Sequence, residues 1–289
     1  MRKAFWTLLL PTILLGGVLS LSGCSGQSTR MGGKTNPKVY ERIVSLSPST
    51  TELAGLNLNV SKLKGRTAAC NYPVMVSSAP VVADVKPDYE KLALVKPDLV
   101  FYDGDLYNAQ DIQKIEQLGV KTFKSSALTI DDFLKDIYRI GSLLGNETGI
   151  STYADRVYNA RAQSLANKPA REIKVALVIP GQNSEHMIVG TGAFQGDVIR
   201  AAGATPVGPT ADRFVPLKVE DLIAANPDFI FTSGKKEPIL ADPRLKTVKA
   251  VATKRVIALN PDVALRRGGR VDKLIETIHA QIVGTEAGK

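Results

Sequence analysis

The most informative pattern of apolar and polar positions in this chain occurs twice, 130 residues apart. Residues 90–101, Glu-Lys-Leu-Ala-Leu-Val-Lys-Pro-Asp-Leu-Val-Phe, return at 220–231 as Glu-Asp-Leu-Ile-Ala-Ala-Asn-Pro-Asp-Phe-Ile-Phe. Proline ends a helix, and the apolar run after each Pro-Asp pair suits a buried strand of a parallel sheet. Each copy predicts the end of a helix, a turn and a strand. Together they indicate two similar lobes, with a cleft between them or a pseudo-symmetric partner.

Outside the repeat, short apolar runs alternate with segments whose apolar residues recur at helical spacing. The first half predicts a strand at 42–48, a helix from 49–52 onward, a loop at 76–84, a helix at 88–95, a strand at 98–102, a helix at 109–118 and a strand at 120–123. The second half predicts strands at 174–179, 228–232 and 256–259, and helices at 196–202, 219–225 and 271–283. This alternation predicts an α/β fold in which helices flank mainly parallel sheets.

Two longer helices are predicted between these halves, at 130–144 and 148–166, and they meet near Gly145-Asn146. The second has about 20 residues and is therefore about 30 Å long, enough to run the length of a small domain. We expect one long backbone helix, residues 147–168, to join an N-terminal lobe, 39–146, to a C-terminal lobe, 169–289. Such a helix is a stiff connector rather than a flexible hinge.

The N-terminus has the pattern of an export signal. Arg2 and Lys3 precede an apolar stretch that ends near residue 21, as in a secretory signal peptide covering residues 1–23. The run Leu-Ser-Gly-Cys that ends at Cys24 resembles a bacterial lipobox, which implies that Cys24 becomes the lipidated first residue. Residues 24–38 then form a polar tether. The alternative is an uncleaved membrane anchor. We expect a protein held by lipid in the cell envelope, in the periplasm or on the outer face of the cytoplasmic membrane.

Composition excludes several classes of function. The net charge of +9 falls by two when the signal is removed, and the remaining basic residues are scattered, so nucleic acid is a poor candidate partner. Two histidines, His186 and His279, are too few for a transition-metal receptor, so we predict no metal site. No nucleophile elbow or phosphate-binding glycine loop occurs, so we predict no catalytic residue and no enzyme. With Cys24 lipidated, Cys70 has no disulfide partner.

Several tracts in this order resemble one family. Residues 43–52, 89–101, 190–203, and 242–245 followed by 255–262 are similar to the periplasmic binding proteins of ABC importers for ferric siderophores, haem and vitamin B12. The resemblance covers nearly the whole mature chain. It implies two lobes joined by a backbone helix, a small-molecule ligand held in the cleft between them, little hinge motion, and delivery to a permease dimer in the cytoplasmic membrane. We expect a monomer.

The resemblance also implies how such a protein meets its permease. One surface glutamate on each lobe pairs with arginines of the permease, and by position these are Glu90 and Glu220. Two exposed carboxylates on matched lobes can address two equivalent arginine pockets and contribute orientation and association rate. The alternative is that each acid only stabilises the first turn of its helix, by about 0.3 to 1 kcal/mol.

The ligand site is predicted at the loops that follow the strands, because ligands in such sheets lie beyond the carboxyl ends of the strands. The side chains that we expect to meet the ligand are Ser47, Tyr72, Tyr102, Asp103, Asp105, Phe194, Arg213, Phe214, Asp262 and Arg266.

The nature of the ligand is less fixed than the class of protein. The run Cys70-Asn-Tyr-Pro73 most resembles vitamin B12 binders, in which a tyrosine lies against the corrin, although an ordinary turn explains it equally well. The chain departs from those binders near Tyr102, where it lacks a tryptophan. We expect no resident cofactor and a transported corrinoid. The alternatives are a ferric siderophore, whose negative charge Arg213, Arg266 and Arg267 can meet, haem, and a structural envelope lipoprotein. Arg270 can be structural instead.

Overall fold

The computed structural model describes residues 38–57, 60–84 and 86–287. Within them the chain forms two separate sheets, one in each half, with helices packed on both, so the predicted α/β class is confirmed. The predicted signal segment, Cys24 and the tether up to residue 37 lie outside the described residues. No helix in the described ranges is long and apolar enough to cross a bilayer.

The first lobe is built on five parallel strands. They lie in the order β3-β2-β1-β4-β5, and the central strands are almost wholly buried. The strands are β1 (Ile43–Ser45), β2 (Leu63–Thr67), β3 (Val81–Ala83), β4 (Leu99–Asp103) and β5 (Lys121–Ser125). The helices are α1 (Pro48–Asn57), α2 (Tyr89–Val95), α3 (Ala109–Glu116) and α4 (Ile130–Leu144).

One prediction for this lobe was wrong. The segment 76–84, expected to be a loop, contains the end of a 3-10 helix, Val74–Ser78, and the edge strand β3. Residues 81–83 are only three apolar positions between a proline and an aspartate, which is too short a run to show a strand period. Their strand conformation comes from parallel pairing with β2, a contact that the local sequence does not encode.

The second lobe has a mixed sheet in the order β11-β10-β6-β7-β9, with β8 paired to β6. Strands β6, β10 and β11 are parallel, whereas β7 and β9 run antiparallel at one edge. The strands are β6 (Lys174–Ile179), β7 (Met187–Val189), β8 (Thr205–Pro206), β9 (Phe214–Pro216), β10 (Phe229–Ser233) and β11 (Val256–Leu259). The helices are α6 (Phe194–Ala201), α7 (Val219–Ala225), α8 (Glu237–Ala241), α9 (Lys249–Ala252), α10 (Pro261–Leu265) and α11 (Val271–Ala287).

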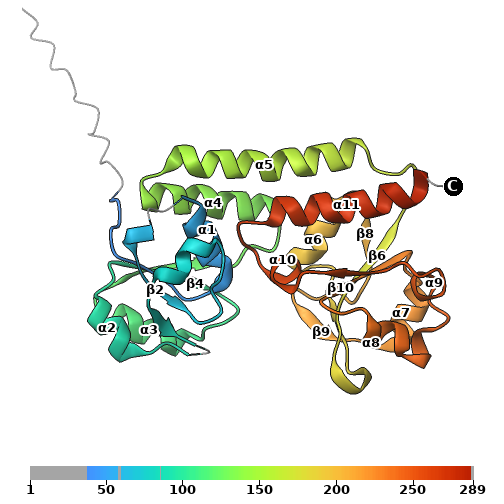
Figure 1. Ribbon diagram of the computed structural model, residues 1–289, viewed down its shortest axis with the longest axis horizontal. Coiled ribbons are helices and arrows are strands. Elements are labelled where there is room, and N and C mark those ends of the chain that lie inside the picture. The colour runs from blue at the N-terminus through green and yellow to red at the C-terminus, as the bar shows by residue number, and fades with distance from the viewer. Residues whose placement is uncertain (1–37, 58–59, 85, 288–289) are drawn as a thin grey trace, which may run out of the picture. The chain divides into compact units, whose positions relative to one another are not determined.

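Helix α5 (Glu147–Ala166) runs alongside both α4 and α11, as Figure 1 shows. The chain turns into it at Gly145, whose positive φ of 68° ends α4, and Asn146 caps the new helix by accepting a hydrogen bond from the Gly149 amide. Tyr153 is fully buried on α5, and its hydroxyl donates to the Gly268 carbonyl at 2.6 Å. One apolar core therefore continues from the first lobe through α5 into the second.

The repeated Pro-Asp turn makes the same bonds in both lobes. Helices α2 and α7 end at Lys96 and Asn226, which adopt left-handed conformations with φ of 44° and 46° directly before the prolines. The Asp98 carboxylate accepts from the Arg42 amide at 2.9 Å, and the Asp98 amide donates to the Arg42 carbonyl at 2.9 Å. Asp228 exchanges the same two bonds with Lys174. The turn thus fastens each repeated strand to the first strand of its lobe.

Candidate ligand-binding cleft

A cavity of about 710 Å³ lies between the lobes, within the range of about 300 to 1,000 Å³ usual for small-molecule sites. Its walls come from loops and helix ends of both lobes. From the first lobe the lining residues are Pro48, Ser49, Asp103, Gly104, Asp105, Leu106 and Leu128; from the second they are Ile179, Phe194, Gln195, Asp212, Arg213, Phe214, Leu265, Arg266 and Arg267.

The topology explains why these residues meet. Strands β4 and β6 end at Asp103 and Ile179, so their carboxyl ends border the cavity, as expected for parallel sheets. Phe194 begins α6 and is 2% exposed, with its ring centroid 5.3 Å from that of Phe133 in the core. Gln195 beside it donates through Nε2 to the Leu265 carbonyl at 2.8 Å. The floor of the cavity is therefore anchored in the main core.

A buried arginine crosses from the second lobe into the acidic wall of the first. Arg267 is 7% exposed, and its Nη2 lies 2.5 Å from Asp103 Oδ1 and 2.8 Å from Asp105 Oδ2. Its Nη1 donates to the Ala127 carbonyl at 3.2 Å. Burial raises the pKa of Asp103, and the neighbouring guanidinium opposes this shift. Because Arg267 and Asp103 are both buried, removing either one leaves the other as an unpaired buried charge, which strongly lowers the stability of the fold.

A second set of contacts joins the same two surfaces around Glu52 of α1, which is 1% exposed. Its carboxylate accepts from Arg266 Nη1 at 3.0 Å, from Arg270 Nη2 at 2.5 Å and from the Gly269 amide at 3.0 Å. A buried carboxylate with several donors is well compensated. We call the three arginines, Arg266, Arg267 and Arg270, together with Glu52, Asp103 and Asp105, the interlobe clasp.

Six of the ten predicted ligand residues line the cavity, namely Asp103, Asp105, Phe194, Arg213, Phe214 and Arg266. All three cavity arginines are already in ion pairs. Arg266 and Arg267 belong to the clasp, and Arg213 Nε is 2.9 Å from Asp212 Oδ1 on the exposed side of the site.

The other four predicted ligand residues do not line it. Ser47 is buried and bonded to Thr50, with 2.8 Å between their hydroxyl oxygens. Tyr72 is half-buried, with the Arg270 guanidinium 4.4 Å from its ring centroid, and Asp262 is bonded to Arg266 at 2.5 Å. Tyr102 packs in the smaller core cluster with α2 and α3. It follows Phe101 and precedes Asp103, so the alternation of a strand turns it to the opposite face of the sheet.

The sequence reasoning missed Gln195, Leu106 and Leu128 in the lining, and Glu52 as the centre of the clasp. Glu52 carried a signal, because an acid within the apolar positions of a helix needs a cationic partner when it is buried. The partner was visible as three arginines within residues 266–270.

No group of three or more His, Cys, Asp or Glu side chains in the described part of the chain could hold a metal ion. Buried His186 accepts at Nδ1 from the Gly181 amide at 3.1 Å, and its Nε2 lies 3.4 Å from Asp242 Oδ2. Burial lowers its pKa. Cys70 is buried against the hydroxyls of Thr51 and Thr67.

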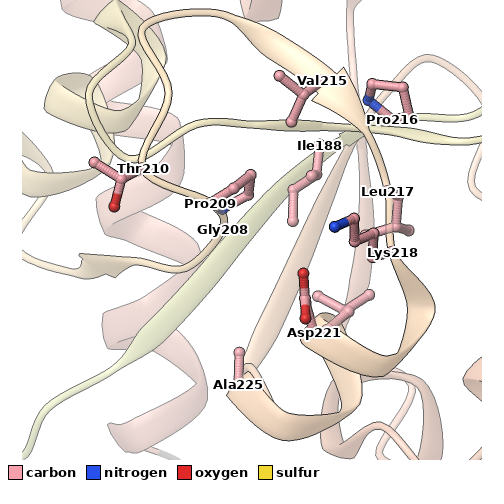
Figure 2. A pocket seen from close by; sticks show the side chains of 11 residues that line it. Ile188, Gly208, Pro209, Thr210, Val215, Pro216, Leu217, Lys218, Asp221 and Ala225 are labelled. Atoms are coloured by element: carbon pink, nitrogen blue, oxygen red, sulfur yellow. The ribbon is translucent and has the colours of Figure 1, made fainter.

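A second cavity, of about 520 Å³, lies wholly within the second lobe (Figure 2). It separates α7 from the antiparallel edge of the sheet, and its wall is mostly apolar. We call it the α7 hollow; it is lined by Ile188, Gly208, Pro209, Thr210, Val215, Pro216, Leu217, Lys218, Asp221, Leu222 and Ala225. Because one lobe supplies every lining residue, the interlobe cavity is the better candidate for a ligand site.

The two predicted docking acids lie in the first turns of α2 and α7 and are exposed. Within the described residues, neither Glu90 nor Glu220 has an ion-pair partner within 4 Å. The pKa of Arg244 is raised mainly by its hydrogen bond to Asp242, and the charge of Glu220 adds a smaller contribution in the same direction.

Comparison with known families assigns residues 43–263 to the periplasmic binding proteins. A vitamin B12-binding protein of Vibrio cholerae is 26% identical over 257 residues, which cover 84% of this chain and 89% of that protein. An uncharacterised ABC transporter substrate-binding lipoprotein of Bacillus subtilis is 25% identical over 263 residues, with 85% and 82% covered.

Solved structures share the fold. A periplasmic haem-binding protein in complex with two haems superposes with a TM-score of 0.74 at 21% identity, covering 86% of this chain and 99% of that one. The periplasmic vitamin B12-binding protein of Vibrio cholerae superposes with a TM-score of 0.73 at 21% identity, with 86% and 98% covered. At these identities the structural likeness concerns the fold alone.

Proposed function

We propose that this chain, which belongs to the periplasmic binding protein family, captures a corrinoid in its interlobe cleft and delivers it to a membrane permease. Members of this family are non-enzymatic, ligand-binding components of ABC importers, and several relatives of this chain are named vitamin B12-binding proteins. The resemblance predicted from the sequence is confirmed at that level. The choice of a corrinoid within the family is our proposal.

The observation that carries this choice is the chemistry of the cavity wall. No His, Cys, Met or Tyr is found among its lining residues in the described ranges, and these are the side chains that ligate haem iron. An anionic ferric chelate favours guanidiniums that are free to bind it. Here Arg213, Arg266 and Arg267 are each paired with a carboxylate.

A corrinoid fits this wall without further protein ligands, because its cobalt is already held by the macrocycle and its edge carries neutral amides. Leu106, Leu128 and Phe214 offer apolar surface to the flat ring. Asp105, Asp212 and Gln195 offer acceptors and a donor to the amides. The metal is then cargo, and the protein needs no resident cofactor.

The same proposal covers the other parts of the transport role. Lipid on Cys24 tethers the chain in the envelope, and the lipoprotein name of the Bacillus relative supports such an anchor. Glu90 and Glu220 meet arginines on the two halves of the permease, which is consistent with their exposure and with their freedom from ion pairs within the described chain.

The test is a titration of the purified chain with cyanocobalamin, haem and ferric siderophores, followed by visible absorbance and thermal midpoint. We expect cyanocobalamin to raise the midpoint, since a ligand that binds only the folded state stabilises it. If haem or a siderophore binds and cyanocobalamin has no effect, the transported ligand is that molecule and not a corrinoid. No response to any of them would favour a structural envelope protein.

Exposed leucines supply a matched pair of variants for the site itself. Leu106→Asp, at the cavity wall, should weaken cyanocobalamin binding about tenfold or more, because a charge replaces apolar contact with the ring. Leu118→Asp, at a similarly exposed leucine outside the cavity lining, should leave it unchanged. If the two variants bind cyanocobalamin with equal affinity, the ligand does not bind in this cavity.

A further inference from the structure

The α7 hollow has the size and the wall of a small-molecule site. Its volume of about 520 Å³ falls within the range of about 300 to 1,000 Å³ usual for such sites, which are mostly apolar with a few polar groups. Ile188, Val215 and Leu222 line it and belong to a core cluster of the second lobe. Its rim is exposed to solvent and includes Lys218 and Asp221. A ligand can therefore reach an apolar wall past two charged side chains.

The first lobe shows that the same helix can cover its core with larger side chains. In α2, Tyr89 and Val95 pack against the smaller core cluster, whereas α7 has Val219 and Ala225 at those positions. Ala225 borders the hollow. Protein interiors are close-packed and hold few voids larger than a water molecule. A space of this size beneath one copy of a repeated helix therefore points to a use for it.

Two opposite charges at the rim are left without partners. Lys218 is the N-cap of α7, and Asp221 lies in its first turn, three residues later. Figure 2 shows the Lys218 amine and the Asp221 carboxylate turned into the hollow. Within the described residues, neither side chain has an ion-pair partner within 4 Å. Lys273 and Glu276, at the same spacing in α11, approach to 2.8 Å. The pair at the hollow is thus open where the spacing allows closure.

These two charges and the wall define the chemistry of a ligand. A ligand carboxylate matches Lys218 and a ligand ammonium matches Asp221, while a ligand with one charge would leave the other side chain unpaired in a partly apolar site. Side chains three residues apart on one turn are neighbours, with Cβ atoms about 5 to 6 Å apart, so the two ligand groups must lie close together. An α-amino acid carries both groups on one carbon. The wall beyond them suits a large apolar side chain.

We propose that the α7 hollow binds a free α-amino acid with a large apolar side chain, with its carboxylate on Lys218 and its ammonium on Asp221. This site goes beyond the proposed transport of a corrinoid and does not depend on it. Residues 208–210 and 215–217 line the hollow, whereas residues 212–214 line the interlobe cavity. Because successive strand residues face opposite sides of a sheet, Phe214 and Val215 of β9 serve different cavities. Both sites can therefore be filled at once.

The test is a calorimetric titration of the purified full chain with L-phenylalanine. We expect a dissociation constant below about 1 mM, since a compact ligand of this size gains enough from an apolar site and two ion pairs. Phenethylamine lacks the carboxylate and 3-phenylpropionate lacks the ammonium, so each should bind about tenfold or more weakly. Equal affinity for all three compounds would overturn the assignment of the charges. No binding of L-phenylalanine at about 10 mM would overturn the site itself.

Variants locate the amino acid. Lys218→Met and Asp221→Asn should each weaken L-phenylalanine binding about tenfold, and Ala225→Val should weaken it several-fold because it narrows the hollow. Lys246→Met and Asp155→Asn change exposed charges outside the lining and should leave the affinity unchanged. Thermal unfolding checks that each variant is folded.

Saturating cyanocobalamin should not displace the amino acid. If it does, or if the three hollow variants bind L-phenylalanine like the two controls, the amino acid does not bind in the α7 hollow. Failure of the parent chain to bind cyanocobalamin would instead remove the proposed corrinoid function and leave the amino-acid site in place.

Discussion

The two lobes repeat a helix, a turn and a strand, yet they bring opposite charges to the cleft. The first lobe supplies Glu52, Asp103 and Asp105, and the second supplies arginines at 266, 267 and 270. The matched parts, including both Pro-Asp turns and the exposed acids Glu90 and Glu220, lie in the scaffold and on the outside. The unmatched parts form the clasp and the cavity wall. The two lobes are therefore alike in the elements that build the fold and differ in the side chains that line the candidate ligand site.

The repeated helices differ on their undersides too. At the positions where α2 has Tyr89 and Val95, α7 has the smaller Val219 and Ala225. The first pair packs against the smaller core cluster of the first lobe. In the second lobe Ala225 borders the α7 hollow (Figure 2). Equivalent helices thus cover unequal amounts of core.

The largest expected effect comes from breaking the charge asymmetry. Arg267→Leu leaves the Asp103 carboxylate buried without its guanidinium, and we expect a loss of about 3 to 5 kcal/mol in the free energy of unfolding. Urea unfolding measures it. The double variant Arg267→Leu/Asp103→Leu removes both charges and should recover most of the loss. A single variant that costs under about 1 kcal/mol would mean that this ion pair adds little to the contacts that the main core and the Glu52 carboxylate make between the lobes.

The Pro-Asp turns allow a direct comparison of two symmetric positions. Asp98 and Asp228 make the same reciprocal backbone bonds, but Asp98 also accepts from the Glu41 amide at 3.0 Å, whereas Asp228 meets Lys249 Nζ at 2.6 Å and Arg171 Nη1 at 3.2 Å. We expect Asp228→Asn to cost about 2 kcal/mol and Asp98→Asn about 1 kcal/mol, because hydrogen bonds to charged groups contribute more than neutral ones. Equal costs would show that the two cations at Asp228 contribute no more than the Glu41 amide does at Asp98.

The stability that Asp228 contributes should also depend on pH. Burial favours a higher pKa for Asp228, but the Lys249 hydrogen bond, the Lys174 amide and Arg171 outweigh it and lower the pKa. A lowered folded pKa gives stability that is present above the unfolded value of about 3.9 and is lost as pH falls through the folded pKa. The stability gap between parent and Asp228→Asn should therefore be constant near neutrality and shrink below about pH 4. A gap that keeps its neutral-pH size as the pH falls through the folded pKa would contradict this linkage.

The repeat was readable from sequence because its information is local. A Pro-Asp pair and the apolar run after it define the turn at 97 and at 227, and the helical period of 148–166 defines α5. What the sequence missed depends on distant partners. The edge strand at 81–83 needs β2, and Arg267 pairs with Asp103, which lies 164 residues away in the sequence. Tyr102 was placed near the ligand because its face depends on strand register, which the local pattern leaves open.

The smallest expected effect concerns the underside of α7. Ala225→Val copies the residue that α2 has at the equivalent position and adds two methyl groups at the wall of the α7 hollow (Figure 2). Each buried carbon contributes about 0.8 kcal/mol, whereas valine costs about 0.6 kcal/mol relative to alanine in a helix, so we expect a net gain of about 1 kcal/mol in urea unfolding. Ala224→Val, on the exposed face of the same helix, carries only the propensity cost and should destabilise slightly. If both variants lower the free energy of unfolding by the same amount, the added methyl groups do not fit into the α7 hollow. The lobes then differ in the position of the helix against its sheet, and not in the volume that the side chains leave unfilled.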